Sequence, residues 1–182
     1  LSAIKDAFSA GWSGVKLYFM IGLPTETDED IAGIVEMAEK AVQIYKEVHQ
    51  GKRRKPVKVT LSVAGFVPKP HTPFQWEAQD QVDEFKRKQR YLKSKLTQRS
   101  IHLNWHDAEV SFLEAVFARG DRKLADALER AWQLGCKFDG WTELYRHDLW
   151  LQAFQEIAID PHFYANRVRS LDEILPWEHL QS

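Results

Sequence analysis

The chain has 182 residues, of which 44% are hydrophobic, and seven of them are Trp, so it can bury a real core and is not a disordered tail. Its 25 Lys and Arg nearly balance 26 Asp and Glu, which excludes a global charge that would draw the whole chain onto nucleic acid or an anionic membrane. The single cysteine, Cys136, excludes an internal disulfide framework and an all-cysteine metal cage within this chain.

The first half of the chain predicts a strand, a crossover helix and a second strand. Residues 1–10 predict a helix that Gly11 ends. The nearly continuous apolar run VKLYFMI at 15–21 is typical of a parallel strand covered on both faces. Residues 28–49 carry an unbroken apolar stripe at helical spacing, and the β-branched segment 57–64 predicts the second strand. Between them, KRRKP at 52–56 predicts an exposed basic turn.

The second half predicts mostly helices. Residues 65–75 contain three prolines and predict a loop, followed by a helix at about 79–98 and a short strand within 100–106. Further helices are predicted at about 108–118, 123–134 and 142–157. We expect Arg119, Asp121 and Arg122 to form ion pairs at the corner between two of these helices. His102 and His106 share a strand face without a third ligand, which favours ordinary core or surface histidines over a metal pair.

The junction GLPTETDED at 22–30 is the first candidate site. A strand followed by Gly and a helix start often holds an anion, but Glu26, Asp28, Glu29 and Asp30 already place negative charge at this end of the helix. Thr25 or Thr27 can cap the helix. Gly22 allows the backbone to pass close to a ligand, so the junction favours a flat, uncharged or cationic ligand such as an adenine. The alternative is an ordinary strand-to-helix turn.

Two stretches resemble the radical S-adenosylmethionine (SAM) superfamily. KLYFMIGLPTET at 16–27 and VTLSVAGFVPKPHTPFQW at 59–76 resemble its fifth and sixth strands, which end in Ile-x-Gly-Leu-Pro-Gly-Glu-Thr and Pro-x-Pro-Gly-Thr-Pro patterns. Thr25 and His71 stand where these patterns have Gly. Residues 105–143 resemble a set of bacterial radical SAM proteins that carry an N-terminal cobalamin-binding-like domain and have no assigned substrate.

The resemblance implies an α/β fold: the C-terminal half of a partial (β/α) TIM-like barrel with parallel strands at 1–105, followed by an α-helical extension at 106–182. It implies an enzyme that cleaves SAM reductively, with a 4Fe-4S cluster, to a 5′-deoxyadenosyl radical. The family's three-cysteine cluster loop is missing from this sequence, so the chain should be a fragment that is inactive alone and whose partner is the upstream half of its own chain. The substrate, a small molecule or an RNA, and the use of cobalamin stay open.

Individual residues carry the family's roles only where the patterns match. Met20, Ile21 and Gly22 correspond to the adenine side of the fifth strand, and Phe66, Val67 and Pro68 follow the sixth strand, which borders the same adenine. Phe66 has the equally good alternative of a core aromatic. Lys69 and His71 lie farther along this loop and are candidates to face substrate, against the alternative of a solvated loop. No catalytic residue and no metal ligand is assigned.

The segment KRKQRYLKSKLTQR at 86–99 supports a rival function. Seven of its fourteen residues are Lys or Arg, a density that favours an RNA-binding module or an RNA-modifying radical enzyme. Apolar residues at 82, 85, 92 and 96 still give the segment a buried side, which favours a solvated outer helix instead. No apolar run reaches the length of a membrane span and no signal segment is recognisable, so we expect a cytoplasmic protein without a membrane partner.

Overall fold

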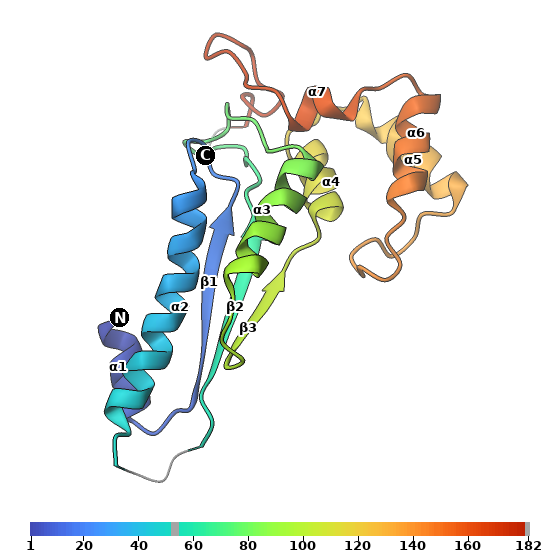
Figure 1. The fold of residues 1–182 in the computed structure, drawn as a ribbon. Helices are drawn as coiled ribbons and strands as arrows, with labels where there is room; N and C mark the ends of the chain where they lie inside the picture. Colours follow the sequence, from blue (N-terminus) through green and yellow to red (C-terminus); the bar gives the residue numbers. More distant parts are fainter. Residues whose placement is uncertain (52–54, 181–182) are drawn as a thin grey trace. The chain divides into compact units, whose positions relative to one another are not determined.

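Three parallel strands organise the first part of the chain. The computed structural model describes residues 1–51 and 55–180, so residues 52–54 of the predicted basic turn lie outside the described residues. Strands β1 (Gly14–Ile21), β2 (Lys58–Gly65) and β3 (Ile101–Trp105) form one sheet in the order β1-β2-β3 (Figure 1). The register pairs Ile21 with Gly65, so β1 and β2 end at the same level. The predicted strand–helix–strand arrangement and the short third strand are confirmed.

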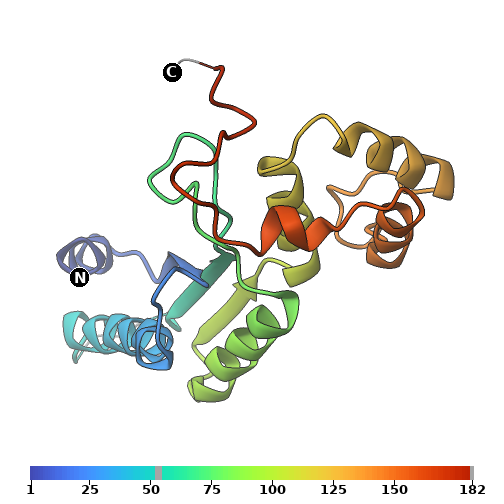
Figure 2. The same cartoon turned by 90° about the horizontal axis from the view of Figure 1, so that it is seen from above.

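Three helices accompany these strands. Helix α1 (Ser2–Ser9) packs on α2 (Asp28–Val48), where the rings of Phe8 and Tyr45 meet edge to face at 5.0 Å. Helix α2 buries the apolar stripe that its sequence predicts, from Ile31 to Tyr45. Helix α3 (Val82–Lys95) is shorter than the predicted 79–98 and lies on the same side of the sheet as α2 (Figures 1 and 2).

The sheet is covered on one face only within this part of the chain. Val59, Leu61 and Val63 of β2 are fully buried on the face toward the helices. On β1, residues alternate between exposed and partly buried, and Tyr18 is 74% exposed. The prediction that 15–21 is covered on both faces is therefore wrong for the described residues. The apolar run at 15–21 was misleading because Tyr18 and Met20, although hydrophobic residues, lie on the uncovered side of the sheet and are exposed.

Helices build the remainder of the chain. The elements are α4 (Ala108–Ala118), α5 (Leu124–Leu134), α6 (His147–Glu156) and α7 (Pro161–Ala165). Their core combines residues of all four helices, among them Phe112, Val116, Ala131, Phe154 and Tyr164. Helix α4 has the predicted bounds, whereas α6 begins five residues later than predicted. Among the described residues, no helix combines the length and apolar character of a membrane span.

The chain divides into two units. The first unit contains Leu1–Gly65 and Glu84–His106, which hold the sheet with α1, α2 and most of α3. The second unit contains Phe66–Asp83 and the chain from Asp107 onward, which hold the loop after β2 and the helices α4 to α7. Both units carry residues that the sequence marks as candidate site residues.

Candidate functional site

Glu26 fixes the turn between β1 and α2. Gly22 is buried and has a φ of +84°, a left-handed conformation that favours glycine. Its backbone N–H donates to Glu26 Oε2 at 2.8 Å, and the same oxygen lies 3.0 Å from Lys88 Nζ of α3. The side chains of Glu26 and Lys88 are both only 7% exposed. A buried ion pair thus ties the Gly22 turn to α3 inside the first unit.

The start of α2 is capped by its own residues. Thr27 is the N-cap: its Oγ1 accepts from the backbone N–H of Asp30, and Asp30 Oδ2 accepts from the N–H of Thr27 at 2.9 Å. The backbone N–H and the hydroxyl of Thr27 both donate to Asp30 Oδ2 and hold the pKa of Asp30 below its usual range, and a hydrogen bond from Arg87 lowers the pKa of Asp28 in the same way. The sequence left Thr25 and Thr27 as alternatives, and Thr27 is the one that caps. Carboxylates therefore occupy the helix end that an anion would need.

Thr25 and His71 share an unusual backbone conformation. Their φ values are +68° and +58°, in the left-handed region where a residue with a Cβ is strained. His71 donates its backbone N–H to Gln75 Oε1 at 3.1 Å, which holds the tight turn of the proline-rich loop. Both residues stand at the positions where the radical SAM patterns have Gly. The chain thus adopts a left-handed conformation at two positions where the patterns that it resembles have glycine.

The predicted residues at the end of β1 differ in accessibility. Met20 is 46% exposed and belongs to the open side of the sheet, whereas Ile21 and Gly22 are buried. The N–H of Gly22 is already engaged by Glu26. A ligand at this end of the strand would therefore meet the side chain of Met20, while Ile21 and Gly22 support the shape of the turn.

The predicted residues after β2 lie in the second unit and are mostly packed. Phe66 is buried, its ring meets that of Phe74 edge to face at 5.6 Å, and its C=O accepts from Gln79 Nε2. Pro68 is buried and Val67 is partly buried. The side chain of Phe66 therefore fulfils the core-aromatic alternative.

Lys69 and His71 are exposed, as expected of loop residues. Lys69 Nζ forms an ion pair with Glu114 of α4, in the same unit. The side chain of His71 is at the surface of the second unit. A role for either residue toward substrate stays a prediction.

The basic segment of α3 is less available than its composition indicates. Arg87 donates to both Asp28 and Glu84, and Lys88 is buried against Glu26. Exposed cations of the segment remain at Arg90, Lys93, Lys95 and Arg99. The rival RNA-binding interpretation therefore depends on these four residues.

Metal-binding groups are not assembled here. Within residues 1–51 and 55–180, no three His, Cys, Asp or Glu side chains lie together as metal ligands would. Cys136 is buried, and burial raises the pKa of its thiol. It packs as a small core residue directly after the αL residue Gly135.

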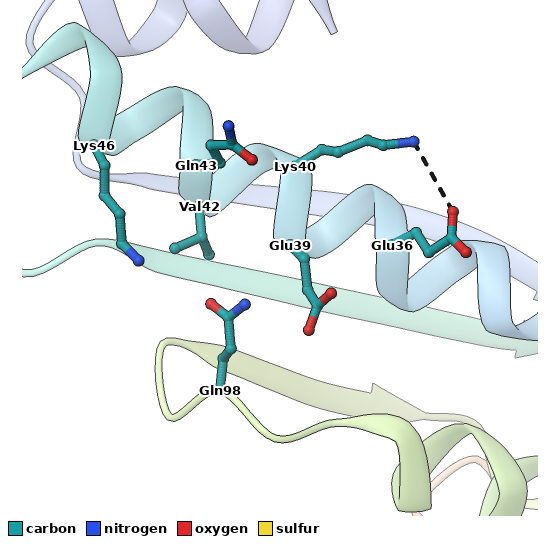
Figure 3. Close-up of a pocket in the computed structure, with 7 residues that line it drawn as sticks. All are labelled: Glu36, Glu39, Lys40, Val42, Gln43, Lys46 and Gln98. Carbon is teal, nitrogen blue, oxygen red and sulfur yellow. Dashed lines mark ion pairs between the residues drawn. The ribbon is translucent and has the colours of Figure 1, made fainter.

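Two surface hollows lie apart from the predicted site residues. One, of about 500 Å³, runs along α2 beside Gln98 and is lined mainly by charged side chains, including the Glu36–Lys40 ion pair (Figure 3). The other, of about 610 Å³, lies in the second unit and is largely apolar, lined by Leu128, Trp132, Phe138 and Trp150 among others. Neither contains a residue that the sequence singled out for cofactor or substrate.

The open side of the sheet is a feature that the sequence analysis missed. The register sets Lys16, Thr60 and His102 in one row and Tyr18, Ser62 and Asn104 in the next, with Met20 and Ala64 beyond them. We call this set, together with Lys58, the open face. The signal was present in the sequence, because polar residues recur at every second position of 58–62 and again at 102 and 104.

Comparisons with known proteins leave the activity open. An uncharacterized protein of Methanocaldococcus jannaschii is 35% identical to the chain over 128 residues. The match covers 70% of this chain and 26% of the relative, so the chain spans about a quarter of the length of the curated relative it matches. No family model matches the chain, and no solved structure matches it significantly.

Proposed function

We propose that the protein containing this chain is a radical SAM enzyme, and that the first unit is part of the C-terminal half of its partial barrel. In this proposal Met20, Ile21 and Gly22 form the adenine side of the SAM site at the end of β1. Phe66, Val67 and Pro68 are the corresponding residues after β2, with a backbone rather than a side-chain role for the buried Phe66.

The backbone of Thr25 and His71 carries this proposal. A resemblance based on residue identity is weakest at the positions where the residues differ. Thr25 and His71 are the two positions where the chain has another residue in place of a glycine of the family patterns. Both adopt φ values that glycine adopts freely and other residues adopt rarely. A chance resemblance gives no reason for the departures to coincide with left-handed residues.

The chemistry of the β1 end fits an adenosyl group better than a phosphate. The helix start is capped by Thr27 and carries Asp28 and Asp30, whose carboxylates would repel a phosphate and tolerate a sulfonium. Met20 offers an accessible, polarizable side chain for the face of an adenine. The turn itself is held by the Glu26–Lys88 pair, so it needs no ligand to keep its shape.

The cofactors would supply the radical chemistry. SAM bound to a 4Fe-4S cluster is a source of the 5′-deoxyadenosyl radical, which abstracts hydrogen from a substrate. The cluster ligands would come from another part of the parent protein, because the family's cluster loop is not in this sequence. The greater length of the archaeal relative leaves room for such a segment. Whether cobalamin takes part is a separate question about the same upstream region.

The test uses the full-length parent protein. Reconstituted anaerobically with iron and sulfide and then reduced, it should release 5′-deoxyadenosine from SAM. Iron and sulfide analysis first establishes that the cluster is loaded. A fully loaded cluster that releases no 5′-deoxyadenosine would contradict the proposal.

A further inference from the structure

The open face carries cations and hydrogen-bonding groups but no acid. Lys58, Lys16 and His102 lie toward the beginning of the strands, and Tyr18, Ser62 and Asn104 follow. None of the three strands contains an Asp or Glu. The face therefore has donors and positive charge to offer, and no carboxylate of its own to neutralise them.

Most of these side chains also have no hydrogen-bond or ion-pair partner within the described part of the chain. Lys16 Nζ lies 4.8 Å from the centre of the Tyr18 ring. Apart from this contact, residues 1–51 and 55–180 provide no hydrogen bond or ion pair to the side chains of Lys16, Tyr18, Ser62, His102 or Asn104. Parallel sheets are normally covered on both faces, and a cation that is covered without a partner costs several kcal/mol.

From this charge pattern we infer that the open face binds the anionic part of a polar small molecule, a carboxylate or a phosphate, between Lys16 and His102. The hydroxyl and amide groups of Tyr18, Ser62 and Asn104 would bind its neutral polar part. That this molecule is the substrate of the enzyme rests on the proposed function, whereas the binding of an anion does not.

The spacing of the rows sets the size of the ligand. Successive rows are two residues apart along the strands, or about 7 Å. The Lys16 row therefore lies about 13 Å from the Met20 row. With the anionic group at Lys16 and the reacting carbon near Met20, the ligand is an elongated polar molecule of about that length.

The test is a footprint of individual lysines in the full-length protein. Trace acetylation with acetic anhydride is measured by mass spectrometry with inorganic phosphate, with citrate, or with sodium chloride at the same ionic strength. At an anion concentration of about four times its Kd, labelling of Lys16 should slow about fivefold. Lys5 and Lys40, exposed on α1 and α2, are the internal controls and should not change. Protection by phosphate alone or by citrate alone distinguishes a phosphate from a carboxylate ligand.

A variant of His102 tests whether this residue takes part in the anion site. His102→Gln should remove most of the protection of Lys16, whereas His179→Gln, an exposed histidine of the second unit, should not. Equal protection of all lysines, no protection of Lys16, or a Lys16 that is unlabelled before any anion is added would each overturn the inference. Release of 5′-deoxyadenosine is measured on the same sample. Protection without release refutes the proposed function and leaves the anion site, and release without protection does the reverse.

Discussion

The two units bury a positive charge in different ways. In the first unit, Lys88 is buried against a carboxylate, Glu26, at 3.0 Å. In the second, Arg119 is 0% exposed, and its guanidinium donates to the carbonyl oxygens of Ala165 and Arg167 at 2.9 and 3.0 Å. The first arrangement fixes a turn at a candidate ligand site. The second fixes the end of one helix to the end of another, which is a purely structural task.

The arginine arrangement depends on helix ends. Ala165 ends α7, so its carbonyl belongs to the partly negative C-terminus of that helix. Arg169 donates in turn to the carbonyl of Arg119 at 2.6 Å. Burial, followed by the charges of Arg169 and Arg167, lowers the pKa of Arg119 to about 10, so it remains protonated at neutral pH. Backbone dipoles thus do for Arg119 what a carboxylate does for Lys88.

The largest expected effect comes from removing the arginine. Arg119→Met removes the guanidinium donors from the carbonyl of Arg167 and from that of Ala165, which keeps only the backbone N–H of Gln79, and should cost about 4 kcal/mol of unfolding free energy. Faster hydrogen exchange in α4 and α7 of the full-length protein would report the loss. The matched control is Arg122→Met, which removes an exposed cation three residues away and should cost less than about 0.5 kcal/mol. Equal effects of the two variants would contradict a structural role for the buried guanidinium.

Breaking the Glu26–Lys88 ion pair should destabilise the protein slightly less than removing Arg119. Lys88→Met leaves Glu26 buried without its cation and should cost about 3 kcal/mol. Adding Glu26→Gln should restore part of this loss, because the amide can still bond within the turn without carrying a charge. Arg87→Met removes the next cation along α3, which is about half-exposed, and should cost less than about 1 kcal/mol of unfolding free energy. Exchange protection of the amides in α3 measures all three, and a double variant no better than Lys88→Met would argue against the pair.

The strained turns should respond in the opposite direction. Thr25→Gly in the first unit and His71→Gly in the second should each stabilise the protein by about 1 kcal/mol, because glycine adopts their positive φ without strain. Thr72→Gly, next to His71 and without a positive φ, should destabilise it by about 0.5 kcal/mol. Thermal unfolding midpoints provide the measurement. Destabilisation by both glycines would remove the observation that carries the proposed function.

The smallest expected effect is a loss of stability of the second unit at acidic pH. A hydrogen bond from Arg167 holds the pKa of Glu173 below its ordinary value of 4.5. A carboxylate with a lowered folded pKa contributes stability above its unfolded pKa and loses it as pH falls through the folded value. The second unit should therefore lose stability as pH falls below about 4.5, and Glu173→Gln should flatten this dependence. Chemical unfolding at a series of pH values checks it, and a Glu173→Gln variant that loses stability in acid as steeply as the unmodified protein would contradict it.

Local sequence patterns predicted most elements of the fold. Helices α2 and α4 follow from apolar spacing, and β1 and β2 from apolar and β-branched runs. Helix α6 was predicted to begin at Thr142, but Trp141 and Leu144 turn to the surface and the helix starts at His147. Helix α7, of five residues, was too short to give a periodic signal.

Contacts between distant residues could not be predicted in the same way. The ion pairs expected among Arg119, Asp121 and Arg122 do not include Arg119, because its side chain turns inward to carbonyl groups whose positions depend on the folding of residues 161–169. The pairing of Glu26 with Lys88 depends likewise on how α3 packs on the sheet. At the candidate site, the sequence indicated the Gly22 turn and the acidic helix start, but not that Met20 is the accessible one among the predicted residues Met20, Ile21 and Gly22.

Binding of SAM tests most directly whether the end of β1 is an adenosyl site. Full-length protein with a loaded cluster is dialysed against labelled SAM, and the chain's two methionines provide a matched pair, since Met20 and Met37 are 46% and 38% exposed. Met20→Lys should weaken SAM binding by about tenfold, or about 1.4 kcal/mol, through a lost apolar contact and repulsion of the sulfonium. Met37→Lys should bind SAM as the unmodified protein does. Equal affinity in both variants would contradict the assignment.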